Sequence, residues 1–280
     1  MSVTNAFIEL AQSLGAIYPP QEARTIARYI FEDVFDCRHP DTTEKILSDE
    51  QWAQYQDIQR RLLAHEPWQY IVGYADFYGR KFQVTPDTLI PRPETEELVR
   101  HVLSDIQDGD RILDIGTGSG CIATTLKLAN PSLDITALDN SEQALALARD
   151  NAIQLGADIC WMHDSILNPS KNLLEKRFER IVSNPPYIPQ HEALSLDQNV
   201  AQYEPQGALF VPDTDPLLFY RVIAEAGLMI LVPGGVVWLE IHQAYGQDIV
   251  DMFISYGYRD VACFQDLFKN DRFVRAYRQS

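Results

Sequence analysis

Apolar residues recur every three to four positions in three stretches of the first 65 residues, which is the spacing of amphipathic helices. These runs lie within residues 7–14, 23–35 and 52–62. Pro19 and Pro20 separate the first two runs, and Ser48 with Gln51 forms a capping-box pattern before the third. The pattern predicts a small helical domain over 1–65, and this stretch contains no motif for chemistry.

Between residues 66 and 93 the pattern changes to glycine, aromatic and β-branched residues, which predicts a β-hairpin linker. Prolines close this segment, and Glu94 and Glu96 then suit the first turn of a helix that runs to residue 103. Arg92 lies between two of the prolines. Two roles stay open for it, an ion pair that holds the domains together or a contact with a substrate.

From residue 111 onwards short apolar runs alternate with helical patterns, which is typical of a mainly parallel α/β sheet covered on both faces. We predict strands at 111–115, 134–138, 159–163, 180–183 and 236–241, and helices at 122–128, 141–155, 216–231 and 244–255. The last two strands, 258–264 and 273–277, should be antiparallel. The second domain of the chain, after the linker, therefore spans 94–280.

The composition and net charge of the chain exclude several classes of protein function. The chain has 280 residues, which suits two modest domains or one large domain with an extension, and its 46% hydrophobic and 22% charged residues are typical of a globular protein. Its formal net charge of −17 argues against sequence-independent binding to nucleic acid, because neutralisation of phosphates dominates such affinity. No N-terminal run combines a basic start with a continuous apolar core, and no stretch approaches the length needed to cross a membrane, so we expect a cytoplasmic protein. The four cysteines are scattered, so neither a metal site nor a disulfide framework is predicted.

A glycine-rich turn follows the first strand of the α/β region. Glycines allow the backbone to approach a ligand closely, but the spacing matches neither a phosphate-binding Walker loop nor the dinucleotide fingerprint. Asp114 beside the turn would repel a pyrophosphate and would favour a cationic ligand such as S-adenosylmethionine. The candidate cofactor residues here are Asp114, Gly116, Thr117, Gly118, Ser119 and Gly120.

Two further carboxylates end the second and third strands of this region. Asp139 can accept hydrogen bonds from both hydroxyl groups of a ribose, although one such residue could instead cap the next helix. Asp164 and Ser165 could contact the edge of an adenine. Because the carboxyl ends of parallel strands meet at one edge of a sheet, these side chains should lie together and bind S-adenosylmethionine.

The segment 183–187 follows the fourth strand and contains an amide, two prolines and a tyrosine. Prolines stiffen the backbone and donate no hydrogen bond, so the carbonyl groups here are free to accept one from a ligand. Asn184, Pro185, Pro186 and Tyr187 therefore form a plausible receptor for a planar NH2 group. A proline-rich loop with no chemical role is the alternative.

At this point the chain resembles the HemK/PrmC family of protein-(glutamine-N5) methyltransferases, which act on translation release factors. The resemblance covers nearly the whole chain and rests on the glycine-rich turn and on residues 69–73 (QYIVG), 89–96 (LIPRPETE), 183–188 (SNPPYI) and 203–205 (YEP). It implies a helical N-terminal domain that grips the release factor, followed by a seven-stranded, Rossmann-like class I methyltransferase domain.

The resemblance also implies site residues. Gly116 to Gly120, Asp139, Ser165 and Asn184 should line the cofactor site, and Asn184 to Tyr187 should hold the glutamine of the Gly-Gly-Gln loop. Residues 211–216 stand where the family commonly has a loop with two glycines, and His242 and Ser165 replace a glycine and an aromatic residue.

We expect the Asn184 side-chain oxygen and the Pro185 carbonyl to accept the two N–H bonds of the substrate amide, with Tyr187 stacked on its plane. No metal is needed, S-adenosyl-L-homocysteine is the product, and we expect a monomer. Three alternatives remain, which are glutamine methylation of a ribosomal protein, amino-methylation of an adenine in DNA or RNA, and a module that binds without turnover.

Overall fold

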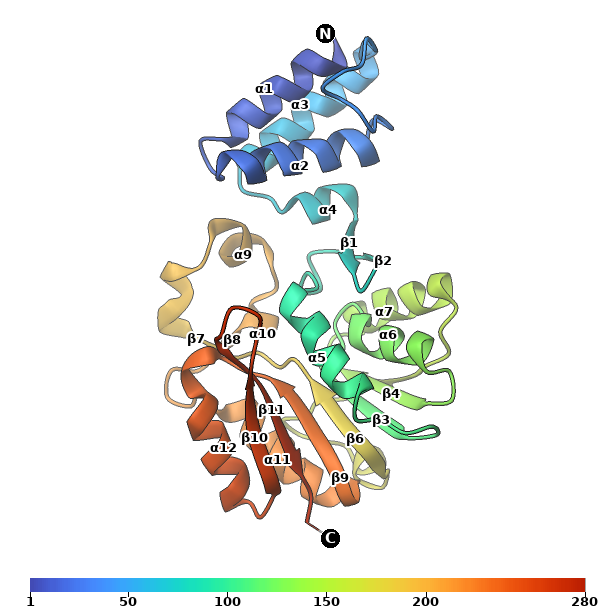
Figure 1. The fold of residues 1–280 in the computed structure, drawn as a ribbon, viewed down its shortest axis with the longest axis vertical. Helices are drawn as coiled ribbons and strands as arrows, with labels where there is room; N and C mark the ends of the chain where they lie inside the picture. Colours follow the sequence, from blue (N-terminus) through green and yellow to red (C-terminus); the bar gives the residue numbers. More distant parts are fainter. Residues whose placement is uncertain (280) are drawn as a thin grey trace. The chain divides into compact units, whose positions relative to one another are not determined.

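A computed structural model describes residues 1–279 and divides them into two compact units. The first unit comprises residues 1–74 together with 197–203, and the second comprises the remaining described residues. The helices of the first unit are α1 (Val3–Leu14), α2 (Pro20–Asp33), α3 (Asp49–Leu63), α4 (Trp68–Val72) and α9 (Gln198–Tyr203) (Figure 1).

The first unit has its own apolar core, which the three amphipathic runs build as predicted. Phe7, Phe31 and Tyr55 are fully buried in it, and the Tyr55 hydroxyl donates to the carbonyl of Ala6 at 3.1 Å. The capping box predicted at Ser48 is present and starts α3. The N-terminal helical region is therefore confirmed.

The predicted hairpin is present as β1 (Tyr74–Phe77) and β2 (Arg80–Gln83), but the apolar run before it is helical. This run forms α4, which begins after Pro67 and ends at Gly73, a residue with φ of +83°. Aromatic and β-branched residues favour strands only weakly, and here the flanking proline and left-handed glycine decide the local structure instead.

A seven-stranded sheet forms the centre of the second unit, in the order β10-β11-β9-β6-β3-β4-β5. All neighbours are parallel except β11, which is antiparallel to both β9 and β10. The predicted α/β fold with a mainly parallel sheet is confirmed. The strands are β3 (Arg111–Ile115), β4 (Asp134–Asp139), β5 (Cys160–His163), β6 (Phe178–Ser183), β9 (Leu231–Glu240), β10 (Arg259–Gln265) and β11 (Asp271–Tyr277).

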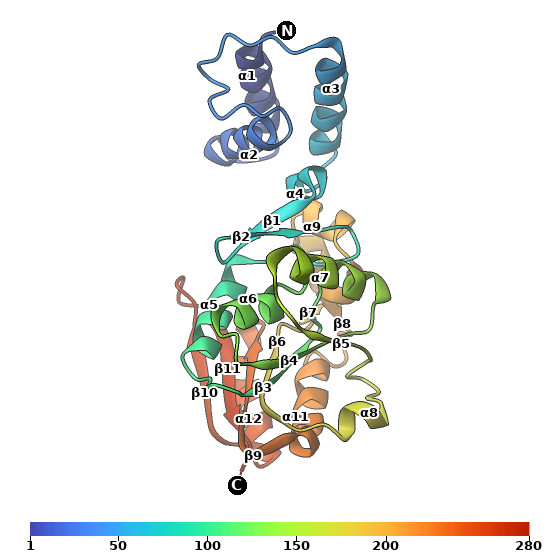
Figure 2. The same cartoon turned by 90° about the vertical axis from the view of Figure 1, so that its right-hand side faces the viewer.

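Helices cover both faces of this sheet (Figure 2). Alternate strand residues point to opposite faces, so Ile112 and Val182 belong to one core cluster while Leu113 and Ile181 belong to the other. The helices of the first face are α5 (Pro93–Leu103), α6 (Cys121–Ala129) and α7 (Glu142–Leu155), and those of the second are α8 (Lys171–Leu174), α11 (Leu218–Ile230) and α12 (Gly246–Ser255).

Short elements complete the second unit. They are β7 (Ile188–Pro189) paired in parallel with β8 (Phe210–Val211), the 3-10 helices η1 (Gln190–Ser195) and η2 (Gln243–Tyr245), and α10 (Gln206–Leu209). No helix within residues 1–279 has the length and hydropathy required to cross a membrane.

Strand register determines which residues meet at the carboxyl edge of the sheet. Ser183 of β6 pairs with Ile115 of β3 and with Leu239 of β9, and Ile115 pairs with Leu138 of β4. The residues that follow these positions, Gly116, Asp139, Asn184 and Glu240, therefore emerge side by side at one edge although they lie far apart in the sequence.

Candidate active site

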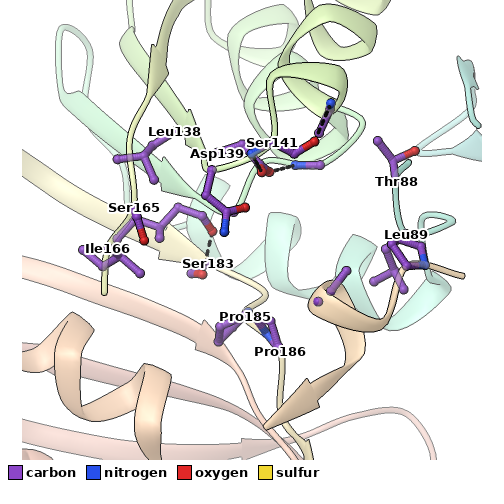
Figure 3. A pocket seen from close by; sticks show the side chains of 18 of the residues that line it. Thr88, Leu89, Leu138, Asp139, Ser141, Ser165, Ile166, Ser183, Pro185 and Pro186 are labelled. Carbon is purple, nitrogen blue, oxygen red and sulfur yellow. Dashed lines mark hydrogen bonds between the residues drawn. The ribbon is translucent and has the colours of Figure 1, made fainter. Parts of the chain in front are cut away.

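A cavity of about 340 Å³ opens at this edge, within the second unit. Figure 3 shows Leu138 and Ile166 on one side of it and Leu89 on the opposite side, with Asp139 between them and Pro185 below. Of the residues predicted for the site, those that line the cavity are Gly116, Gly118, Asp139, Asp164, Ser165, Asn184, Pro185 and Pro186.

The glycine-rich turn lies against the cavity in a conformation that requires glycine. Gly116 and Gly118 have φ of +72° and +56°, and a Cβ added to either would meet no atom within 4 Å. Such a Cβ would occupy open space beside the cavity, where a ligand can approach the backbone. Gly120 has a different role, because a Cβ there would lie 3.0 Å from the Cβ of Ala148 on α7.

Three other residues predicted for cofactor binding support the turn and do not line the cavity. Asp114 is fully buried and accepts a hydrogen bond from the Thr117 hydroxyl at 2.7 Å. Burial raises the pKa of the Asp114 carboxyl to about 7, while the hydrogen bond from Thr117 acts in the opposite direction. Ser119 is buried, and its carbonyl accepts from the side chain of Asn151 at 2.9 Å.

Asp139 connects the end of β4 to the glycine-rich turn. Its carboxylate accepts the backbone N–H of Gly118 at 2.9 Å and that of Ser141 at 3.0 Å. Ser141 itself caps α7 through a hydrogen bond from the amide of Ala144 at 3.1 Å, so Asp139 is not the capping residue. Each oxygen of Asp139 retains a lone pair with which it can accept from a ligand in the cavity.

The next strand contributes Asp164 and Ser165. The Asp164 carboxylate accepts from the amide of Ser165 at 2.8 Å and from the Ser170 hydroxyl at 2.5 Å, which fixes the start of the following turn. Ser165 lines the cavity together with two neighbours that sequence reasoning did not identify, Ile166 and Leu167. These two provide an apolar wall that a serine alone would lack.

Asn184 is held from behind by a buried hydrogen-bond network. Its side-chain amide donates to the Thr95 hydroxyl at 3.1 Å, and Thr95 donates to the Glu240 carboxylate at 2.7 Å. The Tyr187 hydroxyl donates to the other oxygen of Glu240 at 3.2 Å, and burial raises the pKa of Tyr187. Burial likewise raises the pKa of Glu240, to about 7.

Arg92 does not line the cavity. Its guanidinium lies 2.5 Å from the carboxylate of Glu204, which is 3% exposed and also accepts the backbone N–H of Ile90 at 3.2 Å. Both partners of this ion pair belong to the second unit, so the pair does not join the two units.

His242 has structural contacts near the site. Its Nδ1 accepts the amide of Ala244, and its Nε2 lies 3.2 Å from a carboxylate oxygen of Glu192. Its ring is oriented edge to face with that of Tyr187, with centroids 6.1 Å apart. In the atypical segment 211–216, Asp213 pairs with His191 at 2.8 Å.

Further cavity residues come from segments to which the sequence assigned no part in cofactor binding. Thr88 and Leu89 belong to the predicted linker, and Gly207, Ala208 and Phe219 lie around α10 and the start of α11. The prolines at 86, 91 and 205 near these residues mark stiff, extended backbone, and they are a signal that points to these segments.

The cavity fits the adenosyl part of S-adenosylmethionine. Its volume lies at the lower end of the range for small-molecule sites, and it combines apolar walls with a few polar groups. Asp139 is placed to accept from a ribose, Leu138 and Ile166 can enclose an adenine, and the backbone of Gly116 and Gly118 can approach the rest of the ligand. Within residues 1–279, no cluster of three His, Cys, Asp or Glu side chains is arranged to hold a metal ion.

Solved structures of methyltransferases have a fold similar to that of this chain. A methyltransferase from Pyrococcus furiosus superposes with a TM-score of 0.56 at 19% identity, over 80% of this chain and all of that one. A 16S rRNA methyltransferase from Thermus thermophilus, solved with AdoMet and guanosine, gives a TM-score of 0.53 at 15% identity, over 74% of this chain and 50% of that one. These likenesses show that the second unit has the fold of a class I methyltransferase.

Sequence comparison narrows the class to one family. The family models described as "Methyltransferase small domain" and "PrmC N-terminal domain" match residues 93–208 and 5–73. The release factor glutamine methyltransferase of Bacteroides thetaiotaomicron is 44% identical over 96% of this chain and 98% of its own length. That of Flavobacterium psychrophilum is 36% identical over 98% and 99%. The chain belongs to the release factor glutamine methyltransferase family.

Proposed function

We propose that this protein transfers the methyl group of S-adenosylmethionine to the side-chain amide nitrogen of the glutamine in the Gly-Gly-Gln loop of translation release factors, with S-adenosyl-L-homocysteine as the second product. The observation that carries the proposal is the orientation of Asn184. Its NH2 group donates a hydrogen bond to the Thr95 hydroxyl, which leaves its oxygen to accept from a ligand in the cavity. Family membership provides the substrate class.

The cofactor supplies an electrophilic methyl group on a sulfonium. The protein must then position a weak nucleophile, because the lone pair of an amide nitrogen is delocalised into its carbonyl. The Asn184 side-chain oxygen and the Pro185 carbonyl accept the two N–H bonds of the substrate amide, which directs the nitrogen towards the methyl group. Both acceptors also stabilise the positive charge that develops on that nitrogen during transfer.

Tyr187 and the glycine-rich turn complete the proposed site. The Tyr187 ring stacks on the plane of the substrate amide, and its hydroxyl stays protonated because burial raises its pKa. Residues 184–187 contain no carboxylate or imidazole that could act as a base, so the proton leaves to water after transfer. Pro186 limits the motion of the loop.

Three wider features belong to the same proposal. The enzyme acts as a cytoplasmic monomer, it contacts the release factor through its N-terminal helices, and it requires neither a metal nor direct contact with nucleic acid. The net charge of −17 supports the absence of direct contact with nucleic acid.

The deciding experiment measures transfer of labelled methyl from S-adenosylmethionine to purified release factor. A factor with Gln→Ala in its Gly-Gly-Gln loop, a DNA duplex and a ribosomal protein fraction serve as alternative acceptors. We expect label on the wild-type factor only. Label on DNA, or on a ribosomal protein but not on the factor, would keep the site and replace the proposed substrate.

A pair of variants tests the role of Asn184. Asn184→Ala should reduce kcat by roughly 100-fold or more, because a positioned charge-stabilising group is removed, while the Kd of S-adenosyl-L-homocysteine changes little. Asn172→Ala, an exposed position on α8, is the matched control. Turnover of Asn184→Ala equal to that of the control would contradict the assignment.

A further inference from the structure

Three elements that are distant in the sequence meet behind Asn184. Thr95 lies in the first turn of α5, Glu240 is the last residue of β9, and Asn184 directly follows β6. Because Ser183 pairs with Leu239, the residues after them lie next to each other at the edge of the sheet. Thr95 and Glu240 are 3% and 1% exposed, so their hydrogen bond is shielded from bulk solvent.

The direction of these hydrogen bonds follows from the chemistry of the groups. An ionised carboxylate only accepts, so the single hydroxyl hydrogen of Thr95 must point to Glu240, at 2.7 Å. The Thr95 oxygen is then left as an acceptor and takes an N–H of Asn184, at 3.1 Å. With its NH2 group turned to Thr95, the Asn184 amide has its oxygen free to face the substrate.

Protonation of Glu240 would remove the constraint on the direction of these hydrogen bonds. Its O–H could donate to Thr95, and Thr95 could then donate its own hydrogen to the oxygen of Asn184. The Asn184 amide would turn over and present its NH2 group to the cavity, where it would repel the N–H bonds of a substrate amide. The ionisation state of one buried carboxyl group would thus decide whether Asn184 accepts or donates.

Building on the function proposed above, we infer that Glu240 and Thr95 are positioning residues, which hold the Asn184 oxygen towards the substrate only while Glu240 is ionised. Glu240 also accepts from Tyr187, so the same carboxylate holds both ends of residues 184–187. Thr95 of segment 89–96 and Glu240 at the end of β9 thus act on Asn184 without touching the reacting atoms.

The groups around Glu240 determine the pH range in which its carboxyl group titrates. Thr95 and Glu94 face it from α5, Tyr187 from the loop after β6, Arg272 from β11, and Tyr220 from α11. Burial is the strongest influence and raises the pKa to about 7, against the hydrogen bonds of Thr95 and Tyr187 and the positive charge of Arg272. Activity should therefore fall as the pH decreases through this pKa.

The first test uses substitutions at Thr95. Thr95→Val keeps the shape and removes the hydroxyl, and it should lower kcat by roughly 100-fold with KM changed far less, because orientation and not binding is lost. Thr95→Ser restores the hydroxyl and should restore most of the activity. Thr124→Val on α6 is the matched control, since its buried hydroxyl has no hydrogen-bond partner within residues 1–279. Thr95→Val with the kcat of this control would overturn the inference.

The second test compares pH profiles of kcat. The wild type should lose activity on the acid side with a midpoint set by Glu240, whereas Glu240→Gln cannot titrate and should lack this acid limb. An acid limb that persists unchanged in Glu240→Gln would overturn the dependence on ionisation. The Kd of S-adenosyl-L-homocysteine should be similar in the two proteins.

A measurement without turnover separates this inference from the proposed substrate. The side-chain NH2 resonances of Asn184, assigned by their loss in Asn184→Asp, should shift with pH in the wild type and stay constant in Glu240→Gln. Resonances that shift equally in both proteins, or in neither, would overturn the inference. If the resonances behave as expected but release factor receives no label, then only the proposed function fails.

Discussion

The carboxylate of Asp139 accepts the backbone N–H of Gly118 at 2.9 Å, so the end of β4 holds the turn that leaves β3. Gly118 has φ of +56°, a conformation that L-residues seldom adopt, and this hydrogen bond helps to maintain it. One side chain thus shapes the turn and lines the cavity that the turn borders. Cofactor affinity and the geometry of the turn should therefore respond together to changes at Asp139.

Asp139→Ala should weaken the binding of S-adenosyl-L-homocysteine, because both the ribose acceptor and the support of Gly118 are lost. Loss of charge-assisted hydrogen bonds of about 1.5–3 kcal/mol corresponds to an increase of roughly 10- to 100-fold in Kd. Isothermal titration calorimetry measures the change. Asp134→Ala, at the exposed start of the same strand, should leave Kd unaltered, and an unchanged Kd for Asp139→Ala would remove the ribose assignment.

Gly118→Ala should impair both stability and binding. A Cβ at positive φ costs about 1 kcal/mol, and here it would also project beside the cavity. Gly109→Ala is the control, because Gly109 has φ of +82° and equally open surroundings but lies away from the cavity. Thermal unfolding should show similar losses for both variants, and only Gly118→Ala should raise the Kd of S-adenosyl-L-homocysteine. Equal affinities would show that the turn does not border the ligand.

Sequence reasoning located those parts of the site that are contiguous in the chain. Strand β3 with its glycine-rich turn, and strand β6 with Asn184, each combine a buried run with the residues that follow it. A short apolar run and a change to turn residues are local signals, and the parallel order of the strands then brings their ends together.

The residues that hold Asn184 in place could not be predicted in this way. Thr95 and Glu240 are 145 positions apart. Segment 89–96 is part of the family resemblance, but it gives no separate role to its threonine, and the last acid of a strand has no distinctive pattern. Thr88 and Leu89 line the cavity from a segment that resembled a simple linker. Such contacts depend on strand register and helix packing, which the spacing of residues along the chain does not specify.

Arg92→Ala tests whether this residue acts through its ion pair with Glu204 or through a contact with the substrate. Its removal leaves the buried carboxylate of Glu204 without its charged partner. Breaking a buried pair costs about 3–5 kcal/mol, and partial exposure of Arg92 reduces the expected loss to roughly 2 kcal/mol in the free energy of unfolding. Urea denaturation measures this loss directly.

The neutral variant Glu204→Gln is the control for Arg92. It keeps an acceptor for the amide of Ile90 and removes the buried charge, so the double variant Arg92→Ala/Glu204→Gln should recover part of the stability. If Arg92→Ala instead leaves the unfolding free energy unchanged and raises KM for release factor, then Arg92 contacts the substrate and the ion pair has no energetic role.

Glu240 should make the folded state less stable as the pH rises. Its folded-state pKa is raised from 4.5 to about 7 by burial, so between these values the folded protein binds more protons than the unfolded chain. The stability that this group contributes is complete below about pH 4.5 and is lost as the pH rises through 7, by up to roughly 3 kcal/mol.

The variant Glu240→Gln does not titrate at this position. As the pH rises, the unfolding free energy of the wild type should therefore fall by that amount relative to that of the variant. A difference that stays constant from pH 4 to 8 would contradict the assignment. Because catalysis is inferred to need the ionised form, the protein is expected to be most active where this carboxyl group stabilises it least.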